Sequence, residues 1–156
     1  MVDKIRTHGV PRPPATVGWF LPTDYVIART RFRRRFAQLY LQGSDPIRSV
    51  LDLNAGTHGF GGELKASGSA YLALEANPQL RLELARQDVE AKTWVAPHLP
   101  VENDTQDLVL AWAFLEHLPT WHAALEQLSE IQRVLRPGGR LVVVAPNGLA
   151  MGRTFW

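Results

Sequence analysis

The sequence predicts an α/β fold in which five parallel strands alternate with helices. Two observations indicate this fold. Short apolar runs of strand length are separated by segments whose apolar residues repeat with helical spacing. A glycine-rich loop also follows the first run, and a Pro-Gly-Gly turn precedes the last. Such an alternation forms a parallel sheet with helices on both faces, and the functional crevice is expected at the carboxyl ends of the strands.

The elements are expected in a regular order. Strands are predicted at residues 49–53, 70–75, 93–96, 107–113 and 140–145, and helices at 60–66, 78–87 and 120–135. Pro78 suits the first position of its helix, where a missing N–H breaks no hydrogen bond. Gly68 and Gly138 mark tight turns between these elements.

The composition favours one globular domain. The chain has 156 residues, of which 46% are hydrophobic, so it can bury a core. It contains no cysteine, which excludes disulfides and thiolate metal sites. No apolar run reaches the roughly 18 residues of a membrane span, and prolines and charges interrupt the first residues. We therefore expect a cytoplasmic protein without a transmembrane segment.

Charge is distributed unevenly along the chain. Residues 1–48 carry nine Lys or Arg and three Asp, whereas the remainder carries eight basic and twelve acidic residues. Residues 1–22 are rich in proline and are predicted to be an extended lead-in. Residues 23–46 are predicted to hold a basic amphipathic helix, from about 25 to 41. Its arginines could contact nucleic-acid phosphates or an anionic membrane, but a solvated helical face is the simpler interpretation.

The segment Val50 to Leu64, VLDLNAGTHGFGGEL, carries the strongest functional signal. Its glycines let the chain turn sharply and let a ligand approach main-chain N–H groups. Asn54 is of the non-glycine type best suited to a positive φ, so it can preserve the turn. Asp52, embedded in a core strand, needs a partner, for which a bound cation and a loop N–H are the two candidates.

Four blocks of the chain resemble class I S-adenosylmethionine-dependent methyltransferases, especially the group that includes the ubiquinone and menaquinone biosynthesis enzymes. The blocks are VLDLNAGTHG, LALEANPQLRLELAR, APHLPVENDTQDLVLAW and FLEHLPTWHAALEQLSEIQRVLRPGGRLVVVAPN. They occur in the family's order and spacing and span about two thirds of the chain. The resemblance implies a Rossmann-like, S-adenosylmethionine-binding core over residues 47–147, followed by a short tail over 148–156.

The resemblance also implies a cofactor site at the turns that follow the strands. Glu75 lies about 20 residues beyond the glycine-rich turn, where a carboxylate accepts hydrogen bonds from ribose hydroxyls. A solvated loop acid is the alternative interpretation. Asp52 would orient the ammonium group of the cofactor. The residues implied to bind the cofactor are Asp52, Asn54, Ala55, Gly56, Gly59, Glu75, Ala76, Asn77, Ala96 and Trp112.

Three departures from the family pattern bear on the site. Asn54 and His58 stand where the family's first motif usually has glycine. Val95 aligns with the family's Asp for the adenine amino group, which leaves the backbone of Ala96 for that contact. Beyond Asn147 too few residues remain for the terminal antiparallel hairpin of the family's sheet, so we expect a shortened form or fragment. The fifth strand would then be an open edge, and we expect a second copy or a partner to cover it.

The sequence predicts methyl transfer from S-adenosylmethionine to a small molecule. A sulfonium methyl is already activated, so the protein must supply positioning and at most one base. His117 is the candidate base, and a structural role as the cap of the next helix is its alternative. The histidines lack carboxylate partners at ligand spacing, so no metal is expected. An inactive binding or scaffold subunit is the alternative function, and a dinucleotide oxidoreductase is disfavoured because the chain has no Tyr-x-x-x-Lys pair.

Overall fold

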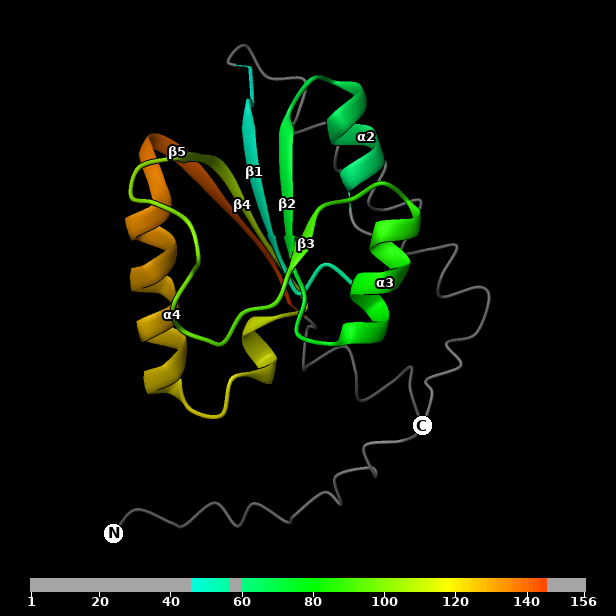
Figure 1. The fold of residues 1–156 in the computed structure, drawn as a ribbon. Helices are drawn as coiled ribbons and strands as arrows, with labels where there is room; N and C mark the ends of the chain where they lie inside the picture. Colours follow the sequence, from blue (N-terminus) through cyan, green and yellow to red (C-terminus); the bar gives the residue numbers. More distant parts are fainter. Residues whose placement is uncertain (1–45, 57–59, 146–156) are drawn as a thin grey trace, which may run out of the picture.

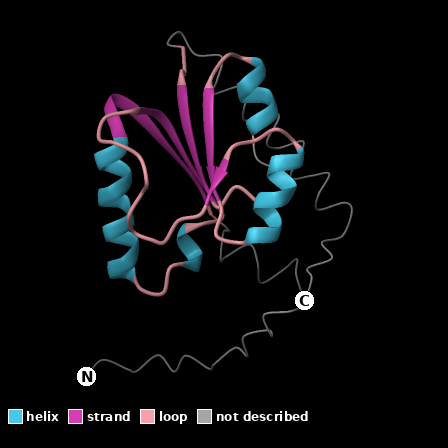
Figure 2. Cartoon of the chain, viewed as in Figure 1, coloured by secondary structure: helices cyan, strands magenta, loops and turns pink. Residues whose placement is uncertain are grey.

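The structure is a computed structural model, and it describes residues 46–56 and 60–145. Five parallel strands form one sheet in the order β3-β2-β1-β4-β5. Helices α2 and α3 lie on one face of the sheet and α4 lies on the other (Figures 1 and 2). The predicted α/β fold is therefore confirmed. The elements are β1 (Ser49–Leu53), α2 (Gly61–Ala66), β2 (Ala70–Leu74), α3 (Pro78–Arg86), β3 (Ala91–Lys92), β4 (Gln106–Trp112), the 3-10 helix η1 (Leu115–His117), α4 (Trp121–Val134) and β5 (Leu135–Val144).

The strand order places the crevice of the fold. The chain builds outward from β1 in one direction through β2 and β3, and in the other through β4 and β5. The order therefore reverses between β1 and β4, and ligands bind at the carboxyl side of such a switch point. Leu53, at the end of β1, lies beside both Leu74 and Ala111. The turns that follow β1, β2 and β4 consequently meet at one edge.

Two apolar clusters hold the layers together, one on each face of the sheet. Val50 and Leu84 belong to the cluster that also includes Leu64 of α2, whereas Leu51 and Ile131 belong to the cluster that includes residues of α4. Val50 and Leu51 are neighbours in β1 and serve opposite faces, because successive strand side chains alternate. Burial of each such side chain stabilises the fold by about 1.5–3 kcal/mol.

Asp107 fixes the register of β1 against β4 at the opposite, amino-terminal edge. Its Oδ2 accepts hydrogen bonds from the N–H groups of Arg48 (2.5 Å) and Ser49 (3.0 Å). The guanidinium of Arg136 pairs with the same, buried carboxylate. The Ser49 hydroxyl adds a hydrogen bond to the Thr105 carbonyl at 2.8 Å. Because these groups lie far from the strand carboxyl ends, they stabilise the sheet without occupying the crevice.

Two predicted elements differ in the structure. The third strand was predicted at 93–96, but β3 covers only Ala91–Lys92, and Val95 is 82% exposed. The prediction was wrong because the apolar residues that suggested a strand lie in the loop after it. The predicted Pro-Gly-Gly turn lies within β5, not before it. Partners of β4 jump there from Leu135 to Arg140, and Gly138 has a φ of 81°.

Several predictions concern residues outside those described. The Pro-rich lead-in at 1–22, the basic helix at 23–46 and the tail at 148–156 all lie there. Among residues 46–56 and 60–145, no helix combines the length and the hydropathy that crossing a membrane requires.

The buried amide of Gln127 yields a test of the packing. Gln127 is fully buried in α4, and neither amide atom has a hydrogen-bond partner within the described residues. An unsatisfied buried polar group destabilises the fold, so Gln127→Met should raise the free energy of unfolding by about 1 kcal/mol. Urea denaturation measures this change. Gln132→Met, at an exposed position of the same helix, is the matched control, and a loss of stability in Gln127→Met alone would contradict the expectation.

Candidate functional site

Glu75 follows β2 and ties two turns together. Its side chain is buried, with only 2% of the residue exposed. Oε2 accepts a hydrogen bond from the N–H of Gly56 at 3.0 Å, and Oε1 accepts one from the N–H of Asn77 at 2.8 Å. One carboxylate thus joins the glycine-rich turn after β1 to the turn after β2. The alternative of a solvated loop acid does not describe this residue.

The turn after β2 is held from its other side by Arg81. The Nη1 of Arg81 donates to the carbonyl of Glu75 at 2.7 Å and to the carbonyl of Ala76 at 2.8 Å. Asn77 caps α3, since its Oδ1 accepts from the N–H of Gln79 at 2.9 Å. These contacts fix the backbone on which Glu75 stands. Sequence reasoning did not single out Arg81, although its position one turn into α3 suits a contact with the preceding carbonyls.

The glycine-rich turn has the backbone that its sequence predicts. Asn54 has a φ of 60° and Gly56 a φ of 63°, so the prediction that Asn54 holds a positive φ is confirmed. The Nδ2 of Asn54 donates to the carbonyl of Ala113 at 3.1 Å, across the switch point between β1 and β4. A Cβ added to Gly56 would meet no described atom within 4 Å. None of the described residues therefore fills the space beside Gly56.

Asp52 lies beneath this turn and is fully buried. Its Oδ2 accepts a hydrogen bond from the hydroxyl of Tyr71 on β2 at 2.5 Å. The sequence had suggested a cation or a loop N–H as the partner, and the structure adds a tyrosine from the neighbouring strand. No local signal reveals it, because the two residues are 19 positions apart and meet only through strand pairing.

Ala55 and Trp112 are the buried apolar residues among the candidates. Ala55 is fully buried, so it can offer a ligand only backbone groups. Trp112 ends β4 and is 7% exposed, and its ring packs against that of Phe60 with centroids 5.8 Å apart. These residues form the apolar floor of the edge.

The loop after β3 carries Val95 and Ala96, both exposed. Beside them, the ring of Trp94 packs against Phe114 with centroids 5.4 Å apart. Among the described residues, no group forms a hydrogen bond with the backbone N–H or C=O of Ala96. Those two groups are consequently available to a ligand at the carboxyl edge of the sheet.

An ion pair on α4 holds the later part of this loop. The Nη2 of Arg133 donates to the Leu99 carbonyl at 2.9 Å, and its Nη1 donates to the Val101 carbonyl at 3.0 Å and to Asn103 Oδ1 at 2.7 Å. The Oε2 of Glu130 accepts from Arg133 at 2.8 Å and from the N–H of Leu99 at 3.0 Å. We call Arg133 and Glu130 the α4 clamp. Chiefly because of the hydrogen bond from Arg133, the pKa of Glu130 falls from 4.5 to about 2.

His117 lies at the end of η1, after β4, and is exposed. The cap of α4 is Thr120, whose Oγ1 accepts from the N–H of Ala123 at 3.0 Å. The alternative role of His117 as that cap is therefore wrong. His122 forms an ion pair with Glu126 at 3.4 Å and its side chain is 83% exposed, as expected for a residue on the outer face of the helix.

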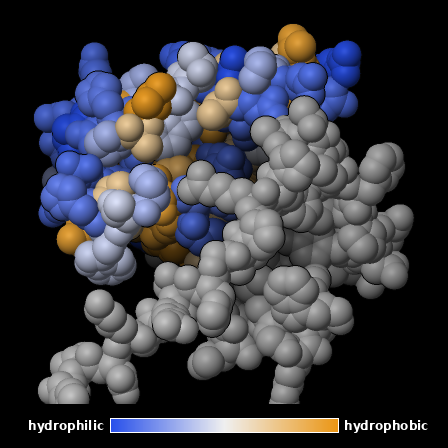
Figure 3. All heavy atoms as spheres, turned by 90° about the horizontal axis from the view of Figure 1, so that it is seen from below, coloured by the Kyte–Doolittle hydropathy of each residue, from blue (hydrophilic) through white to orange (hydrophobic). Residues whose placement is uncertain are grey.

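The predicted site residues thus gather at one edge of the sheet, apart from Gly59, which lies outside the described residues. Figure 3 views the molecule from this side and shows hydrophobic surface beside hydrophilic surface. Within the described ranges, no three His, Asp or Glu residues form a group that could hold a metal ion. The edge combines a buried carboxylate, open backbone groups and an apolar floor, which suits a nucleoside-containing ligand.

Comparisons with known proteins agree with this geometry. A family profile described as a methyltransferase domain matches residues 25–154. The demethylmenaquinone methyltransferase of Lactiplantibacillus plantarum is 34% identical over 121 residues, which cover 70% of this chain and 48% of that protein. A crystal structure of a SAM-dependent methyltransferase from Archaeoglobus fulgidus shares the fold with a TM-score of 0.62 and 17% identity, covering 81% of this chain and 60% of that one.

The chain belongs to the methyltransferase domain family, and its fold is that of the class I S-adenosylmethionine-dependent methyltransferases. It spans about half the length of the curated relatives it matches.

The α4 clamp makes stability depend on pH. The pKa of Glu130 is lowered to about 2 in the folded protein from 4.5, so its stabilising effect is complete above pH 4.5 and is lost as the pH falls toward 2. We expect the wild type to lose more stability than Glu130→Gln over this range, as measured by urea denaturation at each pH. Parallel pH profiles of the two proteins would contradict this expectation.

Proposed function

We propose that this chain binds S-adenosylmethionine and transfers its methyl group to a small-molecule acceptor. The observation that carries the proposal is the Glu75 carboxylate, which stands at the end of β2 and is joined to the glycine-rich turn through Gly56. Its place matches that of an acid that binds ribose hydroxyls beside a glycine-rich turn. The family membership supports methyl transfer as the reaction class.

The residues present fit such a cofactor. A carboxylate oxygen has two lone pairs, so each oxygen of Glu75 can accept a ribose hydroxyl besides its present backbone donor. Because Glu75 is only 2% exposed, we expect the Gly56 N–H to move when the ribose binds. The backbone of Asn54, Ala55 and Gly56 would hold the amino-acid end of the cofactor, with Asp52 below it, and Ala76 and Asn77 would lie beside the ribose.

The chemistry demanded of the protein is modest. The bound cofactor supplies a methyl group on a sulfonium, which is already activated for transfer. The protein then has to hold the acceptor in line and remove its proton where one must leave. His117 is exposed after β4, next to the crevice, and we propose it as that base. Relatives named for demethylmenaquinone support a small-molecule acceptor.

An inactive binding or scaffold subunit is the second candidate. Two observations favour it: both oxygens of Glu75 already accept backbone N–H groups, and the side chain of Val95 offers no polar atom to an adenine. Binding of the cofactor without methyl transfer, or no binding by folded protein, would support this candidate. The cytoplasmic location remains a prediction from the sequence.

We also propose that a second copy covers β5. Within the described sheet, β5 is an edge strand, and Val143 is 42% exposed on it. A groove of about 410 Å³ between α4 and β5 is lined by Leu128, Leu135 and Leu141, among others. An unpaired apolar edge favours pairing with another chain.

The cofactor site can be tested by calorimetric titration with S-adenosylhomocysteine. We expect micromolar binding by the wild type and binding weakened about 30- to 100-fold in Glu75→Gln, since the amide nitrogen cannot accept a hydrogen bond. The matched control is Glu90→Gln, because the Glu90 side chain is exposed and its carboxylate pairs with Lys92. This variant should bind S-adenosylhomocysteine as tightly as the wild type. Equal affinity in wild type and Glu75→Gln would refute the role of Glu75.

The proposed pairing of two copies through β5 can be tested by light scattering. We expect the wild type to be dimeric and Val143→Lys to be monomeric, because a charge on an edge strand opposes pairing. Leu82→Lys, at an exposed apolar position of α3, should leave the dimer intact. A monodisperse wild-type monomer would contradict the proposal.

A further inference from the structure

The loop after β3 has backbone hydrogen-bonding groups that could bind a nucleobase. Val95 is 82% exposed and apolar, so its side chain cannot form a hydrogen bond. The backbone N–H and C=O of Ala96 form none within the described residues. Together they make one donor and one acceptor on the same residue. Adenine presents the complementary pair on its Watson–Crick edge, with N1 as an acceptor and the amino group as a donor.

The backbone of Ala96 is held by contacts on either side of it in the loop. The carbonyl of Lys92 accepts from the N–H of Glu75 at 3.0 Å, which fixes the start of the loop. Between Lys92 and Leu99, no backbone N–H or C=O bonds to a described residue. Leu99 is then held by four contacts: its side chain is fully buried, its N–H donates to Glu130, and its carbonyl accepts from Arg133 and from the N–H of Val101. The position of Ala96 is thus set by these two anchors together with the packing of Trp94 against Phe114.

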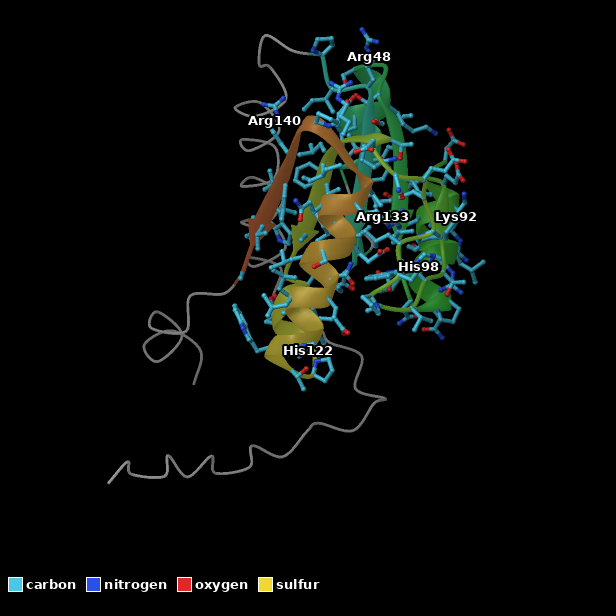
Figure 4. All side chains as sticks on the ribbon, turned by 90° about the vertical axis from the view of Figure 1, so that its left-hand side faces the viewer. Arg48, Lys92, His98, His122, Arg133 and Arg140 are labelled. Atoms are coloured by element: carbon cyan, nitrogen blue, oxygen red, sulfur yellow. The ribbon has the colours of Figure 1, made fainter. Side chains whose placement is uncertain are left out.

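The clamp reaches the loop from a separate layer of the structure. Arg133 lies on α4 and His98 on the loop, and both are labelled in Figure 4, which views the molecule from the side of α4. His98 Nδ1 lies 3.4 Å from Glu130 Oε2, although its side chain is 80% exposed. Arg133 donates to Leu99, Val101 and Asn103 at once. A planar guanidinium can make these contacts together, which a lysine ammonium cannot reproduce.

We propose that Arg133 and Glu130 are positioning residues for adenine recognition: by fixing Leu99 they place the backbone of Ala96 to read the amino group and N1 of the base. The proposal rests on the proposed cofactor site and goes beyond it, because it assigns base selectivity to a clamp on α4. The apolar side chain of Val95 is the reason for this dependence. A carboxylate at position 95 could bind the amino group through its own side chain, whereas recognition by the backbone of Ala96 depends on the conformation of the whole loop.

The test compares two ligands that differ only at the base edge. S-inosylhomocysteine carries an oxygen in place of the adenine amino group and a hydrogen on N1, so its donor and acceptor are reversed relative to S-adenosylhomocysteine. We expect the wild type to bind the adenine compound at least about tenfold more tightly. The ratio of the two dissociation constants is the readout, since a general loss of stability or of ribose binding weakens both ligands equally.

The ratio of dissociation constants is measured for three variants. Arg133→Met should lower the ratio to about twofold or less, because one misplaced hydrogen bond accounts for about a tenfold preference. Arg133→Lys keeps the charge and should still lower the ratio, and it replaces Arg133→Met if that variant does not fold. Val95→Asp combined with Arg133→Met should restore the preference, since the new carboxylate can accept from the amino group. Arg86→Met, an exposed arginine paired with Glu83 on α3, is the matched control.

The outcomes separate the two proposals. A lowered ratio in both Arg133 variants, with rescue by Val95→Asp, supports the clamp. An unchanged ratio in folded Arg133 variants that still bind S-adenosylhomocysteine overturns the clamp and leaves the cofactor site standing. A wild type that binds neither compound overturns the proposed function, and the clamp with it.

Discussion

The Glu75 carboxylate is the interaction on which the carboxyl edge of this protein depends. It is almost fully buried and accepts the N–H groups of Gly56 and Asn77, so it binds the first two turns of the sheet to each other. Burying a carboxylate destabilises the fold unless its oxygens accept such hydrogen bonds. Arg81 holds the same turn through its carbonyls. In the proposed site this carboxylate is in place before the ribose arrives, and binding then requires the Gly56 N–H to move.

The buried carboxylates at the two ends of the strands have different roles, one in stability and one in the proposed site. Asp107, at the amino ends of the strands, accepts two backbone N–H groups and pairs with Arg136. Glu75 has comparable burial but stands between glycine-rich and capping turns at the switch-point edge. The α4 clamp adds a third fixed point through Leu99. Asp107 thus holds the sheet together, whereas Glu75 and Glu130 hold the loops at the carboxyl ends of the strands, and we propose that of these three only Glu75 contacts the ligand.

Much of this arrangement follows from local sequence, and the remainder depends on tertiary contacts. The strand that ends before Glu75 and the positive φ of Asn54 were predictable, because spacing and residue type determine them. The pairing of Tyr71 with Asp52 was not, since it arises from strand register. The error at β3 has a related cause: Trp94 is apolar because it packs on Phe114 from a loop, not because it belongs to the sheet. Short apolar runs leave these two cases indistinguishable.

A cofactor site organised by Glu75 can be tested directly by an NMR titration with S-adenosylhomocysteine that follows backbone amide signals. We predict that the Gly56 amide shifts strongly as the ribose approaches Glu75, with a smaller change at Asn77. The Ser49 amide, bonded to Asp107 at the opposite edge, should not move. Saturable shifts at Ser49 with none at Gly56, or no shifts in a folded sample, would contradict a cofactor site organised by Glu75.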